Sequence, residues 1–211
     1  MGSDPLFDTL FRPTSPSPQA ASAAPVRTAG TRSRAGNAMN RTRSALLDGA
    51  RHAVAAGGTK ITMAQVATAA GVAKATLYNH FRTREAVLSA LLADEVSRLV
   101  ESAAGRPLAD ALAETAASLS DNQMLRSIAR LEPATLARLA RIDLSAECWL
   151  RAREAVRDLL DTAERGGPAT VLRWLASHIV TPASRADIAA DVDVLLAGLP
   201  AAPAAERAVP A

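Results

Sequence analysis

Five side chains that could contact nucleic acid lie within one short stretch of the sequence. They are Lys74, Thr76, Tyr78, Asn79 and His80. Ammonium, hydroxyl, amide and imidazole groups hydrogen-bond to phosphate oxygens or to base edges in the major groove. On an exposed helix these side chains would face outward together, which predicts a DNA-reading surface. For Tyr78 and His80 the sequence leaves a packing role or an ordinary surface role open.

No comparable set of catalytic residues is present. The sequence shows no paired carboxylates beside a histidine, no Ser-His-Asp set, no phosphate loop and no cluster with metal-ligand spacing. Its single cysteine, Cys148, excludes an internal disulfide and a cysteine-based zinc site. We therefore expect no enzyme activity, no metal and no cofactor. Two alternatives stay open: an all-helical enzyme, and a helical interaction module that has lost specific DNA binding.

The residues around this stretch predict a helix-turn-helix over residues 62–81. Thr62 and Gln65 have the spacing of a capping box and would begin a short helix over residues 63–69. Gly71 can adopt the positive φ that a tight turn between two helices demands, and a second helix would follow to about residue 79. Four apolar residues should lock the two helices against the preceding one: Val66, Val72, Leu77 and Phe81.

Helical periodicity also dominates on both sides of this motif. A first helix is expected over residues 41–56, ended by Gly57 and Gly58, and Thr83 should cap a long helix that ends at Gly105 and Pro107. Further helices are expected at 108–119, from a capping box of Ser120 and Gln123, from Pro133, over 145–165, from Pro168, and from Ser184 to 199. Because no period-two pattern occurs, the predicted fold is all-α.

Charge is distributed unevenly along the chain. Residues 1–90 contain eleven Lys and Arg against four Asp and Glu, a balance of +7, whereas residues 91–211 contain thirteen against seventeen, a balance of −4. A basic front half and an acidic back half indicate an anionic partner held by one end of the protein. Nucleic acid is the first candidate.

Composition predicts four segments. Residues 1–38 are rich in Pro, Ser, Ala and Gly and are expected to be disordered, as is the Ala/Pro tail over 200–211. Residues 39–92 would form a three-helix DNA-binding domain, and 93–199 a helical domain. No stretch approaches the roughly 18 apolar residues of a membrane span, and no secretory signal is recognisable. A cytoplasmic protein with no membrane partner is therefore expected.

Residues 41–92 resemble the DNA-binding domain of the TetR (tetracycline-repressor) family of bacterial regulators. The resemblance lies in Ile61-Thr62-Met63-Ala64-Gln65-Val66-Ala67, then Ala70-Gly71-Val72, Thr76-Leu77-Tyr78-Asn79-His80-Phe81 and Arg84-Glu85-Ala86. It implies that Lys74, Thr76, Tyr78 and His80 lie on the recognition helix, that Thr62 caps the preceding helix beside phosphate, and that Arg84 clamps the DNA backbone. One departure is Ala73, which stands where a capping Ser is common and so removes a cap worth about 1 kcal/mol.

The resemblance also implies a dimeric regulator, a repressor that binds a palindromic operator and is released by a small apolar ligand. Two-fold pairing has a physical reason, since one recognition helix reads only a few base pairs. Candidate effector-pocket residues interrupt apolar faces in the C-terminal domain, although each could instead be a core residue: Met124, Cys148, Trp149, Trp174 and His178. Candidate dimer-interface residues lie on wide apolar stripes: Trp149, Val156, Leu159, Val192, Leu195 and Leu199.

Overall fold

The computed structural model describes the backbone of residues 29–202 and the side chains of residues 39–202. Within this range the chain forms α-helices and no β-strand; one isolated bridge joins Arg165 to Ala201. The all-α prediction is confirmed. The chain divides into two compact units between Leu92 and Ala93.

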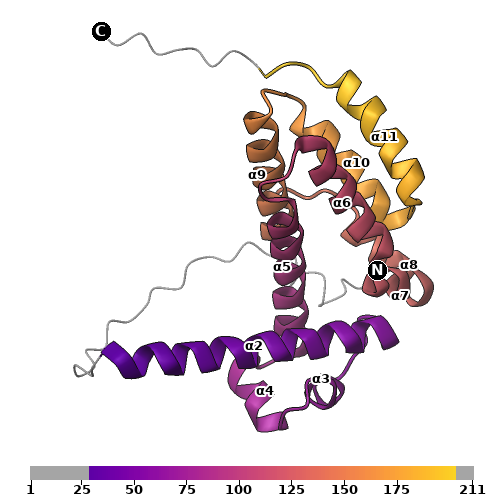
Figure 1. Cartoon of the computed structure of the whole chain (residues 1–211). Helices are drawn as coiled ribbons and strands as arrows, with labels where there is room; N and C mark the ends of the chain where they lie inside the picture. The colour runs from indigo at the N-terminus through magenta and orange to yellow at the C-terminus, as the bar shows by residue number, and fades with distance from the viewer. Residues whose placement is uncertain (1–28, 203–211) are drawn as a thin grey trace. The chain divides into compact units, whose positions relative to one another are not determined.

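The first unit contains α2 (Ala29–Gly57), α3 (Met63–Ala69), α4 (Lys74–His80) and the start of α5 (Arg84–Ala103). α2 packs against α3, and α3 packs against α4, as Figure 1 shows. The helices meet over a small apolar core. Removing apolar surface from water stabilises the folded state by about 25 cal/mol per Å². The members of this core are Leu46, Leu47, Ala50, Val54, Ile61, Val66, Ala67, Leu77, Phe81, Val87, Leu88 and Leu91.

The first helix begins earlier than the sequence predicts. Residues 29–38 were expected to be disordered and the helix to begin near residue 41, but α2 begins at Ala29. Once a helix has formed, each further residue adds one hydrogen bond without a new nucleation cost. Ala and Arg, which are frequent here, have high helix propensity and allow that extension. The rest of the predicted N-terminal segment (1–28), and most of the predicted tail (203–211), lie outside the described residues.

The second unit consists of the end of α5 and six further helices. They are α6 (Leu108–Asp121), α7 (Gln123–Leu131), α8 (Pro133–Leu139), α9 (Glu147–Thr162), α10 (Pro168–Val180) and α11 (Arg185–Gly198). α6 packs against both α10 and α11, and α10 also packs against α9 and α8. α6 and α10 therefore form the centre of this unit.

One predicted capping box in the second unit is wrong. Ser120 was expected to cap α7, but the cap is Asn122, whose side chain accepts hydrogen bonds from the backbone N–H groups of Met124 and Leu125 at 3.0 and 3.1 Å. Ser120 is instead buried in the last turn of α6. A second cap was available two residues further on, and Asn serves as well as Ser in this position.

Other helix ends agree with the sequence. Thr83 accepts from the backbone of Ala86 at 3.1 Å, and Ser184 accepts from Asp187 at 3.2 Å. Pro168 occupies the first turn of α10 after Gly167, which has φ 82°. None of the described helices is long and apolar enough to cross a membrane. The described residues also contain no group of three or more His, Cys, Asp or Glu side chains that could hold a metal ion.

Candidate nucleic-acid interface

The helix-turn-helix is held at its start by the predicted capping box. The Thr62 hydroxyl accepts from the Gln65 backbone N–H at 3.2 Å, and the Thr62 backbone N–H donates to Gln65 Oε1 at 2.7 Å. Gly71 has φ 66° in the turn, where a residue with a Cβ would be strained. Ala73 is the N-cap of α4 and makes no side-chain cap hydrogen bond. The short recognition helix thus depends on packing more than on its own cap.

The crossing of α2 and α3 depends on a glycine that sequence reasoning did not single out. A Cβ placed on Gly49 would lie 2.5 Å from the backbone nitrogen of Ala70 and 2.6 Å from its Cβ. Since non-bonded carbon atoms are best separated by about 3.5–4.0 Å, no side chain fits there. The available signal was a glycine within the apolar face of an otherwise uninterrupted helix. Gly49 therefore fixes how closely the turn end of α3 approaches α2.

The recognition helix α4 presents most of the predicted DNA-contacting side chains to solvent. Leu77 is fully buried and anchors the helix to the core, whereas Tyr78 is 49% exposed. Lys74 and Asn79 are also exposed, and Thr76 and His80 are half-buried. The Tyr78 ring is therefore accessible to a binding partner.

Neither α3 nor α4 contains an acidic residue. A surface that carries Lys74 with no carboxylate on the same helices attracts polyanions without competition from internal ion pairs. The arrangement therefore suits contact with phosphate.

Arg82 and Arg84 lie two residues apart but differ in their surroundings. Arg84, which the resemblance assigns as a backbone clamp, is half-buried, and its Nε and Nη2 donate to Glu85 Oε1 at 3.1 and 3.0 Å. The Glu85 backbone N–H at the helix start, together with Arg84, lowers the pKa of the Glu85 carboxyl. Arg82 is exposed and has no ion pair with any described residue. Arg82 is thus the more available cation of the two.

A second available cation comes from α2. The guanidinium carbon of Arg43 lies 4.9 Å above the centre of the Phe81 ring, and Phe81 directly follows the recognition helix. Such cation–π contacts hold the planar group in place while leaving its N–H donors in the plane free. Arg43 is exposed, so the stacked guanidinium can still donate hydrogen bonds to a phosphate. Sequence reasoning did not select Arg43 as a DNA contact.

Comparison with known proteins agrees with this geometry. Residues 46–91, from the middle of α2 to α5, match the family model described as bacterial regulatory proteins, tetR family. These residues form a TetR-family domain. It is the DNA-binding domain of transcription regulators, so the predicted family resemblance is confirmed.

Two solved structures share the fold at 18% sequence identity. One is a TetR-family transcriptional regulator from Mesorhizobium loti, with a TM-score of 0.52 over 77% of this chain and 98% of that chain. The other is GusR from Salmonella enterica, with a TM-score of 0.51 over 75% and 94%. A comparison with curated protein sequences finds no match. The TetR fold thus covers the second unit as well as the TetR-family domain.

The five expected effector residues lie on three helices of the second unit. Met124 on α7 and Trp149 on α9 are buried, while Cys148 and Trp174 are half-buried. Burial raises the pKa of the Cys148 thiol, which keeps it protonated and unreactive. Among them, the Trp174 and His178 rings meet edge to face with centres 4.8 Å apart.

His178 is the most unusual polar group in the second unit. It is 3% exposed, and its Nδ1 lies 3.3 Å from the Ser120 hydroxyl, whose oxygen accepts from the Ala183 backbone N–H at 3.2 Å. Its Nε2 is buried and has no hydrogen-bond partner among the described residues. Burial lowers the pKa of the imidazole, although nearby Asp191 opposes that shift. The ring is therefore neutral at pH 7.

Most of the expected dimer-interface residues face the interior of their own unit. Trp149, Val156, Val192 and Leu199 are each at most 8% exposed, so their side chains already pack within the protomer. Leu159 and Leu195 are half-buried and retain some accessible surface. Among the large aliphatic side chains that the structure describes in this unit, Val194 on α11 is the most exposed, at 75%, and sequence reasoning did not select it.

Proposed function

We propose that this protein is a dimeric repressor that binds a palindromic operator and releases it when a small, largely apolar effector binds the second unit. The observation that carries the proposal is the exposed, acid-free surface of α4, fixed to the core by Leu77 within a TetR-family domain. Lys74, Thr76 and Asn79 would read base edges, and Tyr78 and His80 would contact phosphates.

Arg43, stacked on Phe81, and Arg82, which follows Phe81, would act as phosphate contacts next to the C-terminal end of the recognition helix. Both are exposed, and neither is in an ion pair with a described carboxylate. Arg84 would instead support the start of α5 through Glu85. Thr62, which caps the exposed start of α3, would hold that end of the helix beside a phosphate.

Dimerisation would use the outer face of α11. Val194 lies there with the small residues Ala186, Ala190 and Ala197, all exposed, and Asp193 borders the same face. Small side chains allow two helices to approach closely. In a two-fold dimer, the same face of α11 from each protomer would meet at the interface. A Val194→Glu variant should sediment as a monomer and lose affinity for a two-half-site operator, whereas Ala129→Glu on α7 should stay dimeric.

The effector would bind where His178 offers its free ring nitrogen. In the tautomer in which the Ser120 hydroxyl donates to Nδ1, Nε2 carries the proton and is a buried donor with no partner among the described residues, which is costly unless a ligand acceptor meets it. An apolar ligand with one carbonyl oxygen would suit this environment. A His178→Phe variant should fold, bind DNA and no longer be released by the effector.

The test is fluorescence anisotropy of the purified chain on DNA from upstream of its own gene, at several salt concentrations, beside a scrambled duplex. Specific binding that weakens steeply with salt is expected. The double variant Lys74→Ala/Tyr78→Ala should lose the preference for the specific duplex. The matched control is Arg130→Ala, which removes an exposed arginine on α7. Equal, weak binding of wild-type protein to every duplex from a genome-wide selection would refute the proposal.

A further inference from the structure

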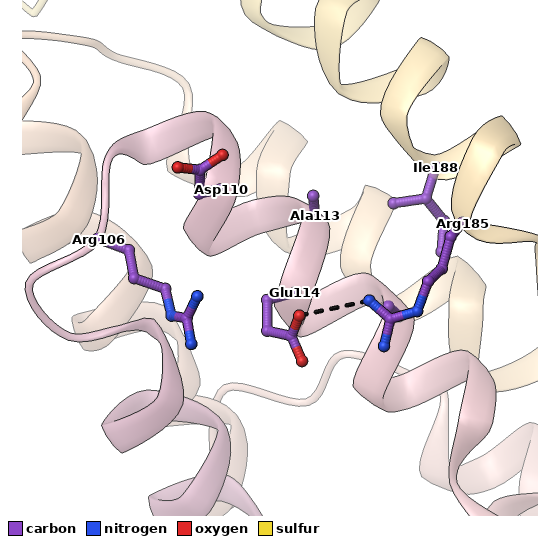
Figure 2. A pocket seen from close by; sticks show the side chains of 7 residues that line it. Arg106, Asp110, Ala113, Glu114, Arg185 and Ile188 are labelled. Atoms are coloured by element: carbon purple, nitrogen blue, oxygen red, sulfur yellow. Dashed lines mark hydrogen bonds and ion pairs between the residues drawn. The ribbon is translucent and has the colours of Figure 1, made fainter.

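A polar cleft of about 200 Å³ lies on the surface of the second unit. It is bounded by α6, by the first residues of α11, and by the turn between α5 and α6. Four charged side chains form its walls: Arg106, Asp110, Glu114 and Arg185. In Figure 2, Arg106 and Arg185 lie on opposite sides of Glu114. None of the residues expected to contact the apolar effector lines this cleft.

The two arginines of the cleft are engaged to different degrees. Arg185 Nη1 lies 3.4 Å from Glu114 Oε2, and Nη2 lies 4.0 Å from Asp121 Oδ2. Arg106 uses only its Nε, which donates to the Ser102 carbonyl oxygen at 2.6 Å. That bond fixes the direction of the guanidinium and leaves its two terminal nitrogens available. Arg106 is therefore placed to receive an anionic group in a two-pronged contact.

A carboxylate on the same side of the cleft is also available. Asp110 is exposed and forms no hydrogen bond or ion pair with any residue of the described chain. Glu114 is only loosely paired, at 3.4 Å from Arg185. The four walls carry two positive and two negative charges. A pure anion would be repelled by Asp110 and Glu114, and a pure cation by the two arginines.

The floor of the cleft is apolar and made of small or aliphatic side chains. Ala113, Ala117 and Ile188 form it, and Ala117 and Ile188 are 2% and 1% exposed. The alanines create the hollow because longer side chains at these positions would fill it. The volume is below the roughly 300–1,000 Å³ of sites for drug-sized ligands, which limits the occupant to a small molecule.

From these features we propose that the cleft binds a free α-amino acid with a short apolar side chain. Arg106 receives the carboxylate, Asp110 and Glu114 receive the ammonium group, and the side chain lies on the floor of Ala113, Ala117 and Ile188. This site is separate from the buried effector site at His178. It takes a doubly charged ligand, whereas the His178 environment takes an apolar one.

The position of Arg106 gives such a site a route to the DNA-binding helices. Arg106 lies three residues after the end of α5 and is tied to its last turn through Ser102 and through its own backbone N–H, which donates to the Ala103 carbonyl oxygen at 3.3 Å. α5 begins at Arg84, just after the recognition helix. An amino acid held by Arg106 therefore attaches the end of α5 to α6 and α11. This consequence rests on the proposed function, but the binding itself does not.

Isothermal titration of the full chain, without DNA, tests the site directly. L-Alanine is the probe, and acetate and methylammonium each supply one of its two charges. L-Alanine should bind saturably, and each single-charge probe at least tenfold more weakly. Arg106→Met and the isosteric Asp110→Asn should each weaken L-alanine binding at least tenfold, since each removes one charged contact.

The matched control is Arg130→Met, which alters an exposed arginine on α7 away from the cleft and should bind L-alanine as the wild type does. Circular dichroism would show that all variants remain folded, which is expected because both altered cleft residues are exposed. Absence of saturable heat with L-alanine would overturn the proposal, and so would wild-type affinity in both cleft variants. If the protein binds L-alanine but not operator DNA, the amino-acid site stands and the proposed regulatory function fails.

Discussion

The two units use arginine in opposite ways. In the first unit, Arg82 and Arg43 are exposed and form no ion pair with a described carboxylate, and the ion pairs are local in sequence, such as Arg84 with Glu85. In the second unit, arginine also joins helices that are distant in sequence, as Arg185 does with Glu114. The cause is the supply of acid: four Asp and Glu in residues 1–90 against seventeen in 91–211. A cation without nearby carboxylates is available to a phosphate, whereas a paired cation is already partly neutralised by its carboxylate.

The largest effect is expected where the DNA-binding helices cross. A Gly49→Val change would force its side chain into the backbone of Ala70 and should destabilise the first unit by about 3 kcal/mol, the upper range for overpacking. Urea denaturation followed by circular dichroism measures this loss, and DNA binding should fail with it.

Gly57→Ala is the matched control for this change. Gly57 lies on the same helix, and nothing lies within 4 Å of an added Cβ. Alanine there should leave stability unchanged or raise it by up to about 1 kcal/mol, because glycine is the poorer helix former. Equal destabilisation by both changes would show that the close crossing does not matter.

The second unit should respond to acid through His178. Its pKa is lowered in the folded protein, mainly because burial disfavours the charged ring. The unfolded chain therefore binds the proton more readily, so stability is fully present above about pH 6.5 and falls as the pH drops through the lower folded pKa.

Thermal unfolding at pH 7.5 and pH 5 measures this dependence. His178→Gln should flatten the fall in stability between the two values, because it removes the group that takes up the proton. His52→Gln, on an exposed position of α2, should keep the wild-type difference. An undiminished difference in His178→Gln would assign the acid response to other groups.

The contrast between free and paired arginines can be measured on DNA. Arg82→Gln and Arg43→Gln should each weaken binding to specific and scrambled duplexes alike and reduce the salt slope by about 0.9. Arg84→Gln should change the slope by less, because its guanidinium is already engaged by Glu85. A larger loss of slope in Arg84→Gln than in Arg82→Gln would reverse the assignment of the clamp.

Sequence reasoning succeeded where a local rule determines the structure. The capping box at Thr62, the turn at Gly71 and the buried anchor Leu77 each follow from residue type and spacing. It failed where the outcome depends on three-dimensional contacts. Ser120 caps no helix because Asn122 competes for α7 and because Ser120 is needed by His178, 58 residues away.

The same limit applies to the second unit as a whole. An apolar stripe marks the buried side of a helix, but it does not distinguish burial within the protomer from burial against a second copy. Val156, Val192 and Leu199 were selected as interface residues on that ground and are buried in their own unit. Exposed aliphatic residues such as Val194 break no sequence rule and become visible only when exposure is known.

The smallest expected effect concerns the missing cap of the recognition helix. Ala73 has the extended backbone of an N-cap, φ −67° and ψ 145°, without a side chain that can accept a hydrogen bond. In Ala73→Ser the hydroxyl can accept from the backbone N–H of Ala75 or Thr76, which should stabilise α4 by about 1 kcal/mol. Amide hydrogen exchange over residues 75–77 should slow by about fivefold, while exchange in α10 stays unchanged. Because a helix already formed in free protein needs less ordering on DNA, affinity for specific and scrambled duplexes should rise together. A gain confined to the specific duplex would instead mean that position 73 contacts bases, and would extend the reading surface one residue before α4.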